Sequence, residues 1–139
     1  MENLRIPGPT PCPPEVLEAM GWPMINHRGP EFKKMLFEVT DELKQVYQTK
    51  NDLFIATASG TGGMEAAVVN TLSPGDRVLS ASCGVYGNRF SAIARAFGAD
   101  VKRLDFEWGQ PVEPEGLERA LQSDPSIKVV LLTHNETCL

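Results

Sequence analysis

Cysteine is scarce in this sequence, and its spacing is irregular. Cys12, Cys83 and Cys138 are the only three cysteines among 139 residues, and two histidines accompany them. An odd number of cysteines without a CxxC pair is not typical of a disulfide framework or of a zinc site. We therefore expect no structural metal and no disulfide scaffold.

Positive charge is the second shortage. Lysine and arginine contribute 13 residues against 18 aspartates and glutamates, so the net charge is −5. Proteins that bind nucleic acids present a basic surface that releases the counterions of the phosphate backbone. We therefore expect no nucleic-acid partner, and any bound anion must be held by local dipoles and hydroxyl groups.

Long apolar runs are missing as well. A membrane-spanning helix needs roughly 20 consecutive apolar residues, and no segment of the sequence approaches that length. The first residues also lack the basic and apolar regions of a signal peptide. These absences predict a cytoplasmic protein without a membrane partner.

Proline, in contrast, is concentrated at the start of the chain. The stretch "RIPGPTPCPP" at 5–14 predicts an extended arm, because proline fixes φ and removes a backbone donor. Pro14 suits the first turn of a helix that ends at Gly21, and a longer amphipathic helix is predicted over about 30–49. Residues 1–50 are thus predicted to form an arm and two helices.

The pattern changes in residues 51–139. Four β-rich runs are predicted to be strands: 53–58, 77–82, 100–106 and 128–134. Three helical segments alternate with them, at about 62–72, 87–97 and 114–122. This alternation predicts an α/β fold, a mainly parallel sheet with flanking helices. The sequence ends at Leu139, soon after the fourth predicted strand, so we expect the first half of a larger domain, truncated here.

The stretch Ser59–Gly63, "SGTGG", joins the first predicted strand to a helix. Free amides and the positive end of the dipole make a helix start suitable for a phosphate. A P-loop is excluded because no lysine follows, and the dinucleotide fingerprint fails because Glu65 stands where its third glycine belongs. The alternative is a plain tight turn with a single-residue helix cap.

Two further stretches follow predicted strands and are expected at the same edge of the sheet. Ligands of parallel sheets bind outside the carboxyl ends of the strands. In "CGVYG", Tyr86 lies between two glycines, where its ring either stacks on a planar ligand or packs under its own loop. "HNET" at 134–137 is either part of a site or a loop with a helix cap.

Six stretches together resemble a known family. They are "PGPTP" at 7–11, "MINHRGPEF" at 24–32, "SGTGGMEAAVVN" at 59–70, "SPGDRVL" at 73–79, "GVYGNR" at 84–89 and "THNET" at 133–137. In this order and spacing the chain resembles the N-terminal part of class V aminotransferases, pyridoxal-phosphate enzymes of fold type I. The likeness is greatest to the alanine–glyoxylate and serine–glyoxylate branch.

This resemblance implies a cofactor, pyridoxal 5'-phosphate, and residues that bind it. It assigns the cofactor phosphate to the small-residue turn: Ser59, Gly60, Thr61 and Gly62. It implies that Tyr86 stacks on the pyridine ring, that Thr137 lies near the ring substituents, and that Gly8 of the arm approaches the substrate. It further implies a homodimer that moves an amino group from a small amino acid, alanine or serine, to the 2-oxo acid glyoxylate.

The sequence also departs from the family pattern. The last motif ends in Cys138-Leu139 where the family continues with Ser/Thr-Thr-Gly. The Schiff-base lysine, the aspartate partner of the pyridine nitrogen and the substrate arginine of the family lie beyond residue 139. Lys50 precedes the first predicted strand, at the wrong edge of the sheet. We therefore expect no catalytic residue in this segment, which alone should be inactive.

Two alternatives remain at this point. A cysteine desulfurase or another class V lyase has a similar "NE" loop, but those enzymes usually stack a histidine on the ring where this chain has Tyr86. A non-catalytic remnant or binding module could retain the phosphate turn without the chemistry.

Overall fold

The computed structural model describes residue 4 and residues 6–137 of the chain. These residues fall into two compact units. One comprises residues 11–57. The other comprises residues 58–137 together with residue 4 and residues 6–10.

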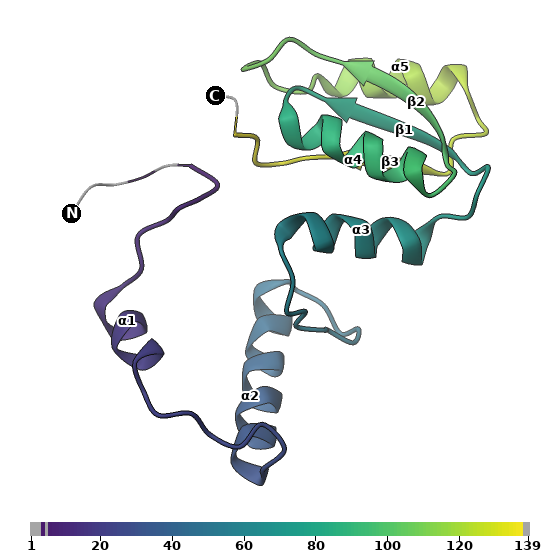
Figure 1. Cartoon of the computed structure of the whole chain (residues 1–139). Helices are drawn as coiled ribbons and strands as arrows, with labels where there is room; N and C mark the ends of the chain where they lie inside the picture. Colours follow the sequence, from purple (N-terminus) through teal and green to yellow (C-terminus); the bar gives the residue numbers. More distant parts are fainter. Residues whose placement is uncertain (1–3, 5, 138–139) are drawn as a thin grey trace. The chain divides into compact units, whose positions relative to one another are not determined.

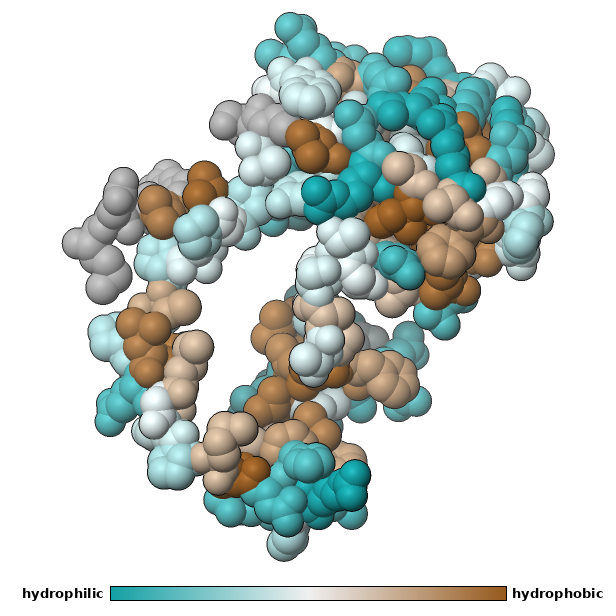
Figure 2. All heavy atoms as spheres, in the orientation of Figure 1, coloured by the Kyte–Doolittle hydropathy of each residue, from teal (hydrophilic) through white to brown (hydrophobic). Residues whose placement is uncertain are grey.

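The smaller unit contains two helices, α1 (Pro14–Met20) and α2 (Pro30–Val46) (Figure 1). Both begin with a proline, whose missing amide hydrogen costs nothing in the first turn of a helix. The predicted end of α1 at Gly21 is confirmed, whereas α2 ends three residues before the predicted Thr49. Large apolar side chains of α1 and α2 remain at the surface, where they contribute brown areas in Figure 2.

The strand predicted at 53–58 is wrong. This segment has no regular structure, and Phe54 is 89% exposed and Ile55 53% exposed. A β-rich composition favours a strand only where another strand can take up the backbone hydrogen bonds. None of the described strands pairs with this segment.

The larger unit is built on a parallel sheet of three strands in the order β2-β1-β3. The strands are β1 (Arg77–Ser82), β2 (Asp100–Asp105) and β3 (Val129–Leu132). Helix α4 (Val85–Ala96) covers one face and α5 (Pro114–Ser123) the other, while α3 (Gly60–Thr71) packs against α4 (Figure 1). The predicted α/β fold with a mainly parallel sheet and flanking helices is therefore confirmed.

The core lies between the sheet and the helices α3 and α4. Its buried members are Val68, Val78, Ala94 and Leu131, so each of these helices and strands β1 and β3 contributes. Strand β1 is central and has five buried residues in succession, as expected of a parallel strand covered on both faces. This packing fixes the carboxyl end of β1, from which the chain enters α4.

Charged side chains gather at the amino end of the sheet. Arg77 pairs with Asp100, and its Nε donates to Asp124 Oδ2 over 3.1 Å. A hydrogen bond from Ser126, followed by that from Arg77, holds the pKa of Asp124 below its usual value. Lys128 similarly lowers the pKa of Asp76 through a contact of 2.7 Å, helped by the amide of Ser73. These ion pairs brace the sheet at the edge opposite the candidate site.

Candidate functional site

A cavity of about 530 Å³ opens at the carboxyl ends of β1 and β3. Three parts of the larger unit line it: the turn Ser59–Thr61 with Met64 of α3, the residues Tyr86, Arg89 and Phe90 of α4, and residues 132–135 at and after the end of β3. Three stretches that are distant in sequence thus meet at one cavity. This is the convergence that the sequence predicts for the ends of parallel strands.

The small-residue turn is the N-terminus of α3, which begins two residues earlier than predicted. Ser59 is the N-cap, and its Oγ accepts a hydrogen bond from the Gly62 amide over 3.2 Å. The hydroxyl hydrogen of Ser59 remains available to donate, and the amides of Gly60 and Thr61 have no partner within the helix. Capping and anion binding are therefore compatible at this turn.

Arg89 supplies a positive charge beside this turn, and sequence analysis missed it. Its Nη1 donates to Thr61 Oγ1 over 2.8 Å, and its guanidinium carbon lies 5.3 Å from the centre of the Tyr86 ring. Residues three apart share one face of a helix, so the spacing of Tyr86 and Arg89 was the available signal. A guanidinium group next to free amides suits a phosphate or a carboxylate.

Tyr86 lies in the first turn of α4, not in a loop as predicted, because α4 begins at Val85. It is half-buried and belongs to the wall of the cavity. Its ring and the Arg89 guanidinium form a cation–π contact. An aromatic ring and a cation thus lie side by side in the wall.

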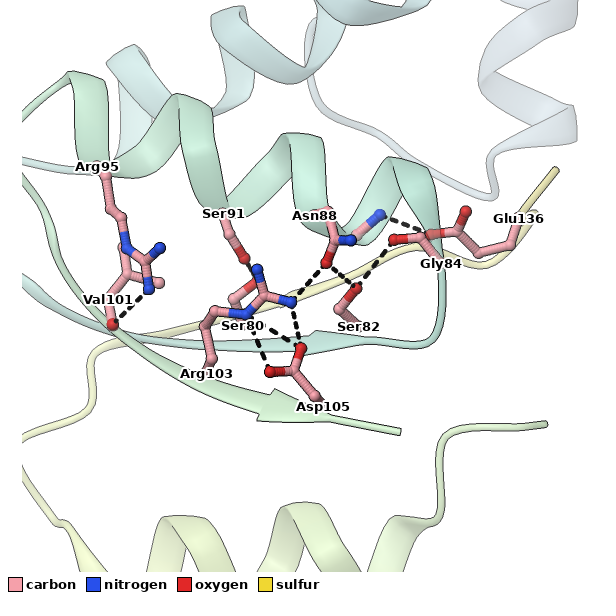
Figure 3. A network of polar contacts seen from close by, with 11 residues as sticks. Ser80, Ser82, Gly84, Asn88, Ser91, Arg95, Val101, Arg103, Asp105 and Glu136 are labelled. Carbon is pink, nitrogen blue, oxygen red and sulfur yellow. Dashed lines mark hydrogen bonds and ion pairs between the residues drawn. The ribbon is translucent and has the colours of Figure 1, made fainter. Parts of the chain in front are cut away.

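Glu136, which lies in the predicted "HNET" stretch, explains why α4 starts early, and sequence analysis did not foresee its contact with α4. Its carboxylate is buried, with 6% exposed, and it accepts hydrogen bonds from the amides of Tyr86 over 2.9 Å and Gly87 over 2.6 Å. Figure 3 shows this side chain reaching from the segment after β3 to the turn at Gly84. The carboxylate therefore replaces the helix cap that Gly84 cannot provide.

A network of polar side chains fastens α4 to the sheet (Figure 3). The buried hydroxyl groups of Ser80 and Ser91 are 2.6 Å apart, which joins the middle of β1 to α4. Ser82 Oγ lies 2.9 Å from Asn88 Oδ1, and Asn88 in turn accepts from Arg103 of β2. The start of α4 is thereby held by two strands as well as by Glu136.

The predicted site residues differ in their placement. The cavity is lined by Ser59, Gly60, Thr61 and Tyr86. Gly62 is not a lining residue, and its amide donates a hydrogen bond to Ser59 Oγ. Thr137 and Gly8 are exposed and are not among the lining residues, so their roles stay predictions.

The described residues contain no group of three or more side chains placed to hold a metal ion. Within the same residues, no helix combines the length and the apolar character needed to cross a bilayer.

The donors around the cavity fit an anion joined to a planar ring. The start of α3 and Arg89 suit the anion, and Tyr86 suits the ring. The buried Oγ1 of Thr133, in the same wall, has no hydrogen-bond partner among the described residues and could bond to a polar ring substituent. Lysine is absent from the lining residues of this cavity.

Comparison with known proteins identifies the family of the chain. The model of the family described as aminotransferase class V matches residues 3–139. The soluble hydrogenase 42 kDa subunit of Anabaena cylindrica is 46% identical over 136 residues, 96% of this chain and 36% of that protein. The L-aspartate–glyoxylate aminotransferase of Paracoccus denitrificans is 42% identical over 135 residues, 95% of this chain and 34% of that protein.

A solved structure is also similar. The ureidoglycine–glyoxylate aminotransferase of Bacillus subtilis superposes with a TM-score of 0.85 at 31% identity, covering 94% of this chain and 34% of that one. The chain thus spans about a third of the length of the proteins that it matches. The resemblance to fold type I class V aminotransferases and to glyoxylate aminotransferases is confirmed.

Proposed function

Since the chain belongs to the class V aminotransferase family, we propose that the complete protein transfers an amino group from a small amino acid to glyoxylate with pyridoxal 5'-phosphate as cofactor. The observation that carries this proposal is the single cavity that joins the start of α3, Arg89 and Tyr86. Alanine or serine is the proposed donor. We place the reaction in the cytoplasm and in a homodimer.

The anion end of the cavity is proposed to hold the cofactor phosphate. The amides of Gly60 and Thr61 and the hydroxyls of Ser59 and Thr61 would donate to it, and Gly62 would keep the turn closed through its bond to Ser59. Arg89 adds a charge-assisted donor next to Thr61. Binding at this end fixes the position of the rest of the cofactor.

The aromatic end is proposed to hold the pyridine ring. Tyr86 would stack on the ring, and Thr137 would lie near its substituents, while Gly8 would approach the substrate. When bound, the cofactor supplies the electron-withdrawing ring that makes the α-proton of an amino acid removable. The role of this chain is to bind the cofactor and to hold it in one orientation.

The acid–base and covalent groups are proposed to come from other residues. A pyridoxal-phosphate enzyme needs a lysine amine to hold the cofactor covalently and to move the proton. Lysine does not line the described cavity, and the chain spans about a third of the length of its relatives. From the family resemblance, we expect the Schiff-base lysine and the substrate arginine in the remainder of the complete protein. The segment alone should bind weakly and should not transaminate.

The phosphate assignment can be tested with a ligand that lacks the phosphate. In the full-length protein, Thr61→Ala and Arg89→Met should each weaken pyridoxal 5'-phosphate roughly ten-fold or more, because each removes a charge-assisted hydrogen bond of about 1.5–3 kcal/mol. Their affinity for pyridoxal should match the wild type. An equal loss for both ligands would show that the turn does not bind the phosphate.

The reaction itself is tested with the cofactor-loaded, full-length protein. Alanine, serine or aspartate should convert the aldehyde form to the amine form, seen as a change in its absorption, and glyoxylate should reverse it. If none of these amino acids changes the spectrum, the proposal is wrong. Sulfide release from cysteine would instead indicate a desulfurase.

A further inference from the structure

The buried carboxylate of Glu136 has a structural position that the proposed reaction does not by itself explain. Its two amide partners, on Tyr86 and Gly87, are the first-turn amides of α4, 50 and 49 positions back in the chain. Such amides have no partner within the helix. The carboxylate satisfies two of them at once and lies at the positive end of the helix dipole.

This contact leaves no spare space around the turn. A Cβ atom on Gly84 would come within 2.6 Å of Glu136 Oε2, and one on Gly87 within 2.5 Å of Ser82 Oγ and 2.9 Å of Ser82 Cα. The backbone on either side of Tyr86 is therefore confined, by Glu136 at Gly84 and by Ser82 at Gly87.

The Glu136 carboxylate also makes the N-terminus of α4 less able than that of α3 to accept an anion. Helices α3 and α4 both begin at this edge of the sheet, and an open helix N-terminus attracts negative charge. At α4 the negative charge of Glu136 already occupies the amides of Tyr86 and Gly87. At α3 the cap is the neutral hydroxyl of Ser59, and Arg89 stands beside it.

We propose that Glu136 is a positioning residue that orients Tyr86 and directs the anion to α3 by closing the start of α4. The inference rests on the proposed function, because the ring and the anion are those of the proposed cofactor. Glu136 is not among the residues that line the cavity. It acts through the two amides, and it links the segment after β3 to the aromatic wall of the cavity.

The first test needs no cofactor. In the cofactor-free, full-length protein, Glu136→Gln should speed hydrogen exchange at the Tyr86 and Gly87 amides roughly 10- to 100-fold, because a neutral side chain with one acceptor oxygen replaces two charge-assisted bonds. Glu107→Gln, on an exposed residue after β2, is the matched control and should change neither rate. Unchanged exchange in Glu136→Gln would overturn the proposal.

The second test asks whether the effect reaches the ligand through Tyr86. Glu136→Ala should weaken pyridoxal 5'-phosphate roughly five- to ten-fold and alter the circular dichroism of the bound cofactor. In a Tyr86→Leu background the same change should cost little more, since the ring that it orients is gone. Fully additive losses would show that Glu136 only stabilises the fold, and would refute the positioning role.

The two tests separate the inference from the proposed function. If the protein does not bind pyridoxal 5'-phosphate at all, the proposed function fails, while the exchange rates still decide whether Glu136 holds the start of α4. Gly84→Ala gives an independent check. Its methyl group would displace the carboxylate, so it should reproduce the faster exchange of Glu136→Gln, and normal exchange would count against the proposal.

Discussion

Two substitutions of Ser59 separate helix capping from anion binding. The asparagine and aspartate side chains have nearly the same shape, but only aspartate carries a negative charge. Its Oγ accepts from the Gly62 amide over 3.2 Å, with the extended backbone of an N-cap. Asparagine and aspartate cap about as well as serine, so Ser59→Asn and Ser59→Asp should both retain α3. Aspartate should even stabilise the ligand-free helix by about 0.3–1 kcal/mol, because its charge faces the positive end of the dipole.

The aspartate that stabilises the ligand-free helix should weaken the binding of a phosphate relative to asparagine. An aspartate carboxylate about 4 Å from a bound phosphate repels it by about 1 kcal/mol per pair of unit charges in water, and by about 4 kcal/mol near a protein surface. Ser59 is exposed, so the lower value applies, and a phosphate with nearly two charges gives about 1–2 kcal/mol. Ser59→Asp should therefore bind pyridoxal 5'-phosphate roughly 5- to 30-fold more weakly than Ser59→Asn.

The assay is a titration of the cofactor-free, full-length protein, together with its thermal unfolding. The difference between the two variants should shrink as salt is added, since exposed charges are screened, and it should vanish with pyridoxal. Ser59→Asp binding the cofactor as tightly as Ser59→Asn would refute the assignment of the phosphate to this turn.

Two further predictions concern stability and are measured by unfolding of the full-length protein. Gly63→Ala in α3 should stabilise by about 0.5–1 kcal/mol, because its Cβ meets no atom within 4 Å. Gly87→Ala in α4 should instead destabilise by about 1–3 kcal/mol, because its Cβ would overlap Ser82, and equal effects would contradict this reading. Hydrogen bonds from Ser126 and Arg77 lower the pKa of Asp124 in the folded state. The ionised Asp124 therefore contributes to the free energy of unfolding above the unfolded pKa of about 3.9, and this contribution is lost as the pH falls through the folded pKa. The gap in stability between the wild type and Asp124→Asn should therefore close below about pH 4, and a gap that stays constant into acid would be evidence against this ion pair.

Local signals predicted the elements whose determinants lie close together in sequence. The strand over 77–82 is a β-rich run after a turn, and it is present with these bounds as β1. Helix α1 begins at the predicted proline and ends at the predicted glycine. The parallel order of the strands followed from their alternation with helices.

The features that the sequence did not predict correctly depend on residues far apart in the chain. The run 53–58 has the composition of a strand but lacks a neighbouring strand among the described residues. Arg89 binds a side chain 28 positions away, and Glu136 binds amides 49 and 50 positions away. No local pattern reports such pairings, so the contact between Arg89 and Thr61 and the early start of α4 became visible only in the structure.

The separation between Glu136 and its amide partners has a consequence for synthesis on the ribosome. Residues 86 and 87 leave the exit tunnel 50 and 49 residues ahead of residue 136, which at roughly 5–20 residues per second is an interval of about 3–10 s. During that time β1 and α4 can already associate, while the amides of Tyr86 and Gly87 bond to water. Slow codons between these points lengthen the interval. The rate of translation therefore sets how long the start of α4 remains without the carboxylate of Glu136.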